Sequence, residues 1–113
     1  MILATVRMAI PPPKRDEALK ILRLTAERCW IRPGCLSCRI YEDVQERDVL
    51  MFEEKWSSKE DLERHLRSDE YYKVLLVMEM ATEHPEVNFS EIARTTGLEM
   101  IEKSRRGLFP IEL

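Results

Sequence analysis

The sequence predicts an α+β fold of the ferredoxin-like type, a βαββαβ core with an antiparallel sheet and an extra C-terminal helix. Three observations support it. Four segments alternate apolar and polar residues as strands do, two long segments carry apolar residues at helical spacing, and their order matches that plan. The 113 residues suit one domain, with a core over about 1–96 and a helix and tail over about 98–113.

The first strand is expected over residues 2–10, and a run of three prolines ends it because proline cannot continue a ladder. Apolar residues then recur at i, i+3 and i+4 from Lys14 to about Ile31, which predicts an amphipathic helix. Pro33 and Gly34 close the connection to the next strand.

Residues 35–44 and 49–56 alternate again on either side of a polar turn, which predicts a hairpin. The second strand carries Cys35 and Cys38. Residues three apart on a regular strand point to opposite faces, so these thiols are not expected to meet at one metal. With Cys29 the count is odd, and the sequence favours free thiols over disulfides, a redox pair or a zinc site.

The fifth and sixth elements follow Trp56. Ser57 and Glu60 form a candidate capping box that starts a short helix ending near residue 66, and Ser68 or Asp69 starts a second helical piece to about residue 80. A fourth strand is expected over 87–95 and a charged helix over 98–106. Both core helices then cover one sheet face, and the uncovered apolar face predicts a homodimer packed sheet against sheet.

Composition excludes several functions. Eighteen Lys and Arg against 21 Asp and Glu give a net charge of −3, which argues against a nucleic-acid partner. No apolar run approaches the ~20 residues of a membrane helix. The first seven residues are typical of a strand and not of a signal peptide, so a cytoplasmic protein is expected. The three glycines form no phosphate-binding loop.

A motif in the middle of the chain resembles the antibiotic biosynthesis monooxygenase (ABM) family. That family shows Pro-Gly before its second strand, Glu-x-Trp ending its third, a helix His nine residues after the Trp, then a Ser or Thr and an aromatic residue. The matching residues are Pro33, Gly34, Glu54, Trp56, His65, Ser68 and Tyr71. The resemblance implies a dimeric α/β barrel, and relatives that oxidise phenolic or quinol-type aromatics with O₂ and no metal, flavin or haem. No cofactor or metal is therefore expected.

Other relatives in this superfamily degrade haem, and the sequence argues against that activity. The haem-degrading branch carries a Trp where this chain has His65, and an iron-ligating His where it has Leu75. It also has an Asn on the first strand, where this chain has Val6 and Arg7. A shared fold does not carry a reaction with it.

The resemblance gives His65 the role of a general base that takes a proton from a phenol, which makes the substrate a better electron donor to O₂. The alternative is a structural histidine that hydrogen-bonds to Glu54. Trp56 either stacks on a flat ligand or packs in the core, and Tyr71 either forms a pocket wall or packs its helix. Glu54 either orients His65 or joins an ion pair at the sheet edge.

Arg39 and Tyr41 share one face of the second strand, where they either steady a negative oxygen or form a polar subunit contact. The first hypothesis is thus a cofactor-independent monooxygenase for a small aromatic, phenol or quinol. The alternative is a non-catalytic dimeric ligand-binding or accessory protein of the same fold. A third hypothesis is that the protein is an interaction module that binds a partner through the terminal helix and the segment 108–111.

Overall fold

The computed structural model describes residues 1–108 and confirms the ferredoxin-like α+β fold. The strands are β1 (Ile2–Ala9), β2 (Cys35–Glu42), β3 (Val49–Trp56) and β4 (Glu86–Glu91). The helices are α1 (Arg15–Cys29), α2 (Lys59–Leu66), α3 (Asp69–Glu79) and α4 (Leu98–Ser104), with a short 3₁₀ turn, η1 (Pro12–Lys14), before α1. The third strand matches its predicted bounds, and the other elements lie within a few residues of theirs.

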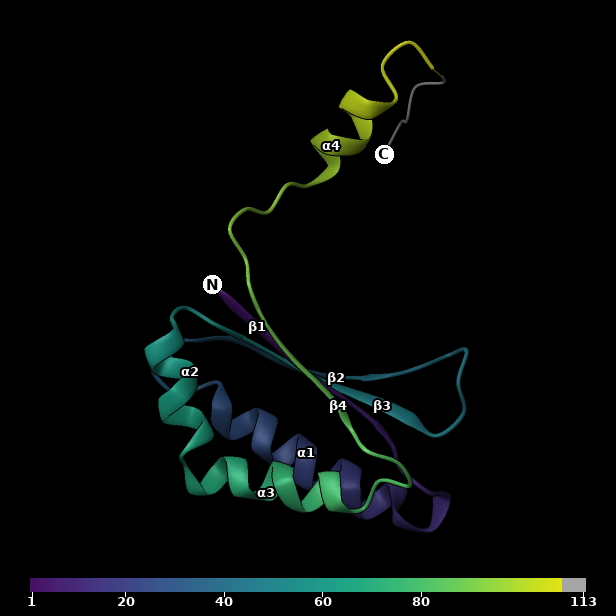
Figure 1. Ribbon diagram of the computed structural model, residues 1–113, viewed down its shortest axis with the longest axis vertical. Helices are drawn as coiled ribbons and strands as arrows, with labels where there is room; N and C mark the ends of the chain where they lie inside the picture. The colour runs from purple at the N-terminus through teal and green to yellow at the C-terminus, as the bar shows by residue number, and fades with distance from the viewer. Residues whose placement is uncertain (109–113) are drawn as a thin grey trace.

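The four strands form one antiparallel sheet in the order β2-β3-β1-β4, and the core helices lie on one side of it (Figure 1). Alternate residues of β1 face those helices and are buried, as its period of two predicts. The main core cluster joins sheet residues such as Val6 and Phe52 to Leu22 of α1 and Val74 of α3. The sheet and the helices thus form two layers around one apolar core.

The start of α2 differs from the predicted capping box. Ser58, not Ser57, is the N-cap, and its hydroxyl accepts a hydrogen bond from the Asp61 N–H at 3.2 Å. The Ser57 N–H instead donates to the Gly34 carbonyl at 2.8 Å. That bond keeps Ser57 in the extended backbone after β3, so the helix begins one residue later than expected.

The fourth strand is shorter than the predicted 87–95. It pairs with β1 only as far as Ile2 opposite Glu91, and the Ile92 N–H then bonds to the Met1 carbonyl at 2.9 Å. Residues 93–95 have no further part of β1 to pair with, although their sequence alternates like a strand.

A β-bulge overturns the expectation that Cys35 and Cys38 point to opposite faces. Cys35 pairs with Trp56 and Cys38 pairs with Glu54, with a register irregularity between Cys35 and Ser37. Trp56 and Glu54 are two residues apart on β3 and share a face, so both cysteines also face the helices. The extra residue in the bulge cancels the alternation on which the sequence argument depended. All three cysteines are free in the structure.

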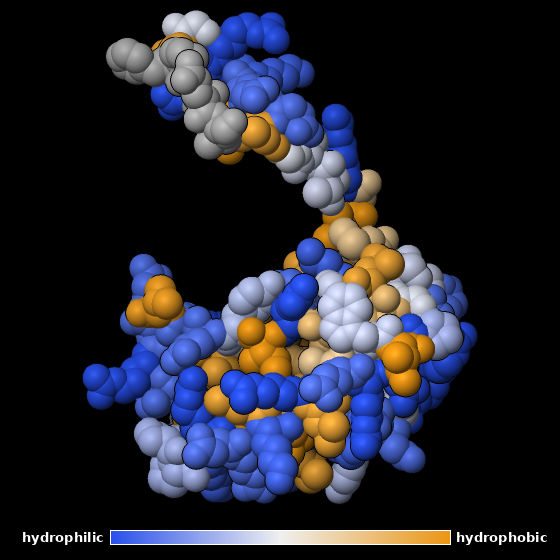
Figure 2. All heavy atoms as spheres, turned by 180° about the vertical axis from the view of Figure 1, so that it is seen from behind, coloured by the Kyte–Doolittle hydropathy of each residue, from blue (hydrophilic) through white to orange (hydrophobic). Residues whose placement is uncertain are grey.

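The terminal helix α4 stands away from the two-layer body at the end of an extended segment (Figure 1). Its apolar side chains, among them Leu98, Met100 and Ile101, are exposed. Seen from behind, hydrophobic residues appear in patches among charged ones on the body and again where the segment toward α4 leaves it (Figure 2). The predicted docking segment 108–111 lies outside the described residues except for Leu108. No helix in residues 1–108 is both long and apolar enough to span a membrane.

Candidate functional site

A buried polar cluster lies between the sheet and the helices. The last turn of α2 turns His65 inward, three residues after the buried Leu62, as helical spacing requires. His65 Nε2 lies 2.7 Å from Glu54 Oε2, and these side chains are 1% and 2% exposed. Cys29, at the end of α1, brings its Sγ to 3.7 Å from His65 Nε2 and 3.9 Å from Glu54 Oε2. The three ionisable side chains thus come from three different elements, α1, β3 and α2, and lie in contact with one another.

Aromatic rings enclose His65 on two sides. The Trp56 ring stacks on the imidazole with centroids 4.6 Å apart, and Tyr71 meets it edge-on at 5.4 Å. Trp56 Nε1 and His65 Nδ1 are both buried without a hydrogen-bond partner among the described residues. Both residues line a small cavity of about 20 Å³, together with residues that include Arg32 and Asp61. That volume admits about one water molecule.

The contacts in the cluster shift its proton affinities. Burial opposes a charge on His65, but hydrogen bonds with Cys29 and Glu54 outweigh burial and raise the pKa of His65 to about 9. The neighbouring Cys38 thiol, against the effect of burial and with the help of His65, lowers the pKa of Cys29 to about 6. The same interaction, together with burial, raises the pKa of Cys38. At neutral pH these values place a thiolate beside an imidazolium.

The pKa of Tyr71 also changes, to about 12, chiefly because burial disfavours the phenolate and secondarily because Glu54 is close. Tyr71 is therefore neutral through the physiological range and contributes an apolar wall to the cluster. Its ring, rather than its hydroxyl, contacts His65.

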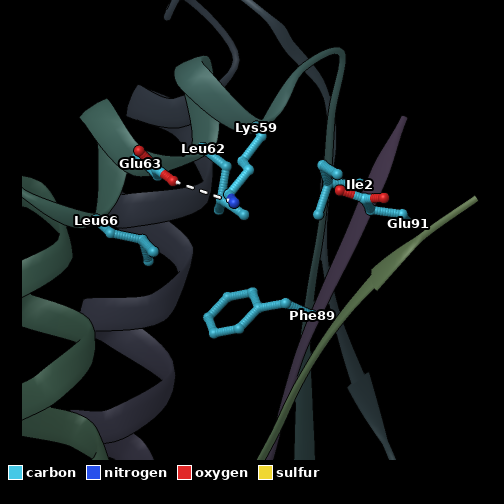
Figure 3. Close-up of a pocket in the computed structure, with 7 residues that line it drawn as sticks. All are labelled: Ile2, Lys59, Leu62, Glu63, Leu66, Phe89 and Glu91. Carbon is cyan, nitrogen blue, oxygen red and sulfur yellow. Dashed lines mark ion pairs between the residues drawn. The ribbon is translucent and has the colours of Figure 1, made fainter.

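An apolar pocket of about 400 Å³ opens between α2 and the β1–β4 edge of the sheet (Figure 3). Phe89 reaches from β4 toward α2, and Lys59 and Glu63 form an ion pair of 3.9 Å at the α2 side (Figure 3). The other lining residues are Ile2, Leu62, Leu66 and Glu91. Its size and lining are those of a site for a small organic molecule.

The pocket and the buried cluster are neighbours separated by one layer of side chains. Ile2 and Leu62 line the pocket and also pack with Trp56 in a second core cluster. Trp56 in turn stacks on His65. His65 is therefore not a lining residue of the pocket in this arrangement, and an apolar layer stands between them.

The structure brings together four of the six predicted site residues, namely Glu54, Trp56, His65 and Tyr71. The other two, Arg39 and Tyr41, pair with Glu53 and Met51 on β3, which face away from Glu54. Arg39 lies over the Trp30 ring, with its guanidinium carbon 5.7 Å from the ring centroid, and Tyr41 lines a separate surface hollow with Arg7. Both residues are thus on the sheet face opposite the cluster.

Sequence reasoning missed Cys29 and the pocket residues. Cys29 was expected only as a buried thiol, and its distance from Glu54 and His65 in the sequence gave no signal of contact. Phe89 and Glu91 could have been assigned to the helix side from the alternation of β4, once its pairing with Ala4 and Ile2 was known.

Comparison with known proteins supports the fold and identifies the family. The family model described as antibiotic biosynthesis monooxygenase, ABM, matches residues 1–74. An uncharacterized protein of the cyanobacterium Synechocystis is 24% identical over 98 residues, covering 86% of this chain and 67% of its own.

Two solved structures show the same fold. A protein from Mycobacterium tuberculosis superposes with a TM-score of 0.76 at 21% identity, covering 85% of this chain and 98% of its own. An antibiotic biosynthesis monooxygenase gives a TM-score of 0.74 at 20% identity, covering 83% of this chain and all of its own. The fold and the pocket define a ferredoxin-like α+β protein with a ligand-sized cavity beside a buried polar cluster. Because the family model covers more than half of the chain, the protein belongs to the antibiotic biosynthesis monooxygenase family.

Proposed function

We propose that the protein is a cofactor-independent monooxygenase that oxidises a small phenol or quinol-type aromatic with O₂. The observation that carries the proposal is the apolar pocket of about 400 Å³ between α2 and β4 in a chain of this family. Phe89 and Leu62 offer apolar surface to an aromatic ring, and the Lys59 ammonium lies where it can stabilise a phenolate oxygen.

The reaction begins with loss of the phenolic proton, which makes the substrate a stronger electron donor to O₂. One oxygen atom then enters the ring as a carbonyl and the other leaves as water, so that a phenol and O₂ give a quinone and water. We propose that His65 accepts this proton as the general base. Glu54 orients His65, and the rings of Trp56 and Tyr71 enclose it. Because Leu62 and Trp56 separate His65 from the pocket, this role includes movement of the Leu62 side chain when substrate binds.

Oxygen uptake with a panel of hydroquinones and naphthols tests the proposal, using chelator-treated protein. We expect turnover to rise as pH approaches about 9, because His65 must lose its proton before it can act as a base. His65→Gln should lower turnover by about 10²–10⁴-fold. His84→Gln is the matched control, because His84 is exposed in the turn before β4. Full turnover in His65→Gln would remove His65 from the mechanism.

A second candidate is a non-catalytic ligand-binding or accessory protein. The observation that favours it is that His65 is 1% exposed, already bonded to Glu54 and held as an imidazolium at neutral pH. Such a histidine fixes structure and leaves the pocket for binding alone. Saturable binding of a naphthol without oxygen uptake at any pH would support this function over the monooxygenase.

We also propose that the protein is a homodimer whose subunits pack sheet against sheet, with α4 resting on the partner. The sheet face opposite the helices carries no covering element among residues 1–108, and the apolar side of α4 is exposed in the single chain. A reducing cytoplasmic setting suits the three free cysteines. Sedimentation equilibrium of the full chain should give twice the 13.4 kDa subunit mass, and a monomer would refute this assembly.

A further inference from the structure

The buried cluster has a second capacity that the proposed reaction does not use. The Sγ of Cys29, the Oε2 of Glu54 and the Nε2 of His65 all lie within 4.8 Å of one another, and all three residues are buried. A thiolate, a carboxylate and an imidazole are the three kinds of side chain that bind Zn²⁺ in proteins. We propose that Cys29, Glu54 and His65 form a binding site for a zinc-like divalent cation.

The distances suit a tetrahedral ion after a small adjustment. With zinc bonds of about 2.3 Å to sulfur and 2.0–2.2 Å to nitrogen and oxygen, the edges of a tetrahedron are roughly 3.4–3.6 Å. The two sulfur contacts, 3.7 Å to His65 and 3.9 Å to Glu54, lie a few tenths of an ångström above that range. The 2.7 Å contact between Glu54 and His65 is shorter because a proton joins them, and it widens when a cation replaces that proton.

The β-bulge places a second cysteine near the cluster. It turns Cys38 onto the face of the sheet that carries Glu54, and the two residues are paired directly across β2 and β3. Cys38 is buried. A regular strand from Cys35 onward would have turned Cys38 to the other face, so the bulge places a second sulfur on the same side of the sheet as the three ligands.

The charge balance favours a cation over an empty cluster. When ionised, the Cys29 thiolate and the Glu54 carboxylate face a single imidazolium, and among the described residues Glu54 has no ion-pair partner besides His65. Buried charges without compensation are costly. The sulfur and nitrogen ligands favour a borderline ion such as Zn²⁺ over Mg²⁺ or Ca²⁺, which prefer oxygen.

Cobalt binding tests the site, because tetrahedral Co²⁺ with thiolate ligands absorbs visibly. We add Co²⁺ to the reduced 113-residue protein in the absence of oxygen and then titrate with Zn²⁺. The expected result is one Co²⁺ per chain, with tetrahedral d–d absorption and a thiolate-to-cobalt charge-transfer band that Zn²⁺ abolishes. A spectrum typical of six oxygen ligands, or no binding, would overturn the proposal. The readout is independent of oxygen uptake, so the monooxygenase hypothesis and this one fail separately.

The variants assign the ligands. Cys29→Ser should weaken Co²⁺ binding by at least about 100-fold. Loss of a residue that only supports a metal ligand costs up to about 100-fold in affinity, and loss of a direct ligand should cost no less. Cys35→Ser is the matched control, because Cys35 is half-buried on the same strand and is not one of the clustered ligands. Equal binding by both variants would refute the assignment.

A second measurement uses the unaltered protein, so that the ligands can be identified even if Cys29→Ser does not fold. X-ray absorption of the zinc-loaded protein should show sulfur together with nitrogen or oxygen around the metal. A shell of nitrogen and oxygen alone would place the ion elsewhere and overturn the proposal.

Discussion

Replacing Cys29 with serine should expose a pH dependence of stability that the native cluster conceals. The pKa of His65 rises from 6.5 to about 9 on folding, so its contribution is fully present below pH 6.5 and is lost as pH rises toward 9. The pKa of Cys29 falls from 9.0 to about 6, so its contribution grows over the same interval. Folding therefore moves a proton from the thiol to the imidazole with little net uptake, and the two effects cancel.

The magnitude follows from the His65 shift. Each tenfold change in proton affinity is worth about 1.4 kcal/mol, so the charged imidazole of His65 contributes up to about 3 kcal/mol in the native cluster. Part of that depends on Cys29, whose hydrogen bond is the strongest influence that raises the pKa of His65. In Cys29→Ser only Glu54 remains, and we expect the free energy of unfolding to fall by about 1–2 kcal/mol between pH 6 and 9.

Urea unfolding in the presence of a chelator, at several pH values between about 6 and 9, measures this effect. The unaltered protein should show nearly constant stability across the range, and Cys29→Ser should lose stability steadily. Cys35→Ser is the control, because burial raises the pKa of Cys35 to about 11 and places its titration above the range. A flat or rising profile for Cys29→Ser would refute the exchange of a proton between Cys29 and His65.

Other substitutions test the packing around the site. Trp56→Ala should lower the free energy of unfolding, measured by urea denaturation, by about 3–5 kcal/mol. The reason is that Trp56, at the end of β3, is only 1% exposed. Ser58→Ala should cost about 1 kcal/mol, because α2 loses its N-cap hydrogen bond. Gly34→Ala should lower the free energy of unfolding by about 1 kcal/mol or more, and with it the melting temperature, because Gly34 has φ +84° and the added Cβ would collide with the Asp61 side chain. Removal of the chain from Leu98 onward should leave the circular dichroism of the body unchanged and weaken self-association, which sedimentation would detect.

The fold could be predicted from the sequence because local patterns and tertiary packing agree along most of the chain. The alternation in β1 and the helical spacing in α1 each bury one side, and that side is the one the core needs. Two predictions were wrong for another reason: Ser57 was expected to cap α2, and the fourth strand was expected to extend to residue 95. Both depend on hydrogen bonds to distant residues, the Gly34 and Met1 carbonyls, which local patterns do not encode.

The site could be predicted only in part. The pairing of His65 with Glu54 follows from a strand face and a helix face that the sequence places correctly. Arg39 and Tyr41 could not be assigned to a face, because the side of β2 depends on its register against β3 and on a bulge. No glycine lies within the bulge at residues 35–37 to indicate it, so the position of Cys38 on the same face as the cluster could not be predicted either.

The two roles argued for the cluster compete for one lone pair. A general base accepts the substrate proton on the same Nε2 that would bind a cation, because Nε2 faces Glu54 and Cys29 while Nδ1 has no partner among the described residues. Zinc bound there would hold His65 unable to accept a proton and would replace the proton that joins it to Glu54. Oxygen uptake by the zinc-loaded protein should therefore fall to the level of His65→Gln if His65 is the base. Uptake that persists with zinc in place would assign the proton to a group in the pocket itself, where Glu63 and Glu91 are the carboxylates that line it.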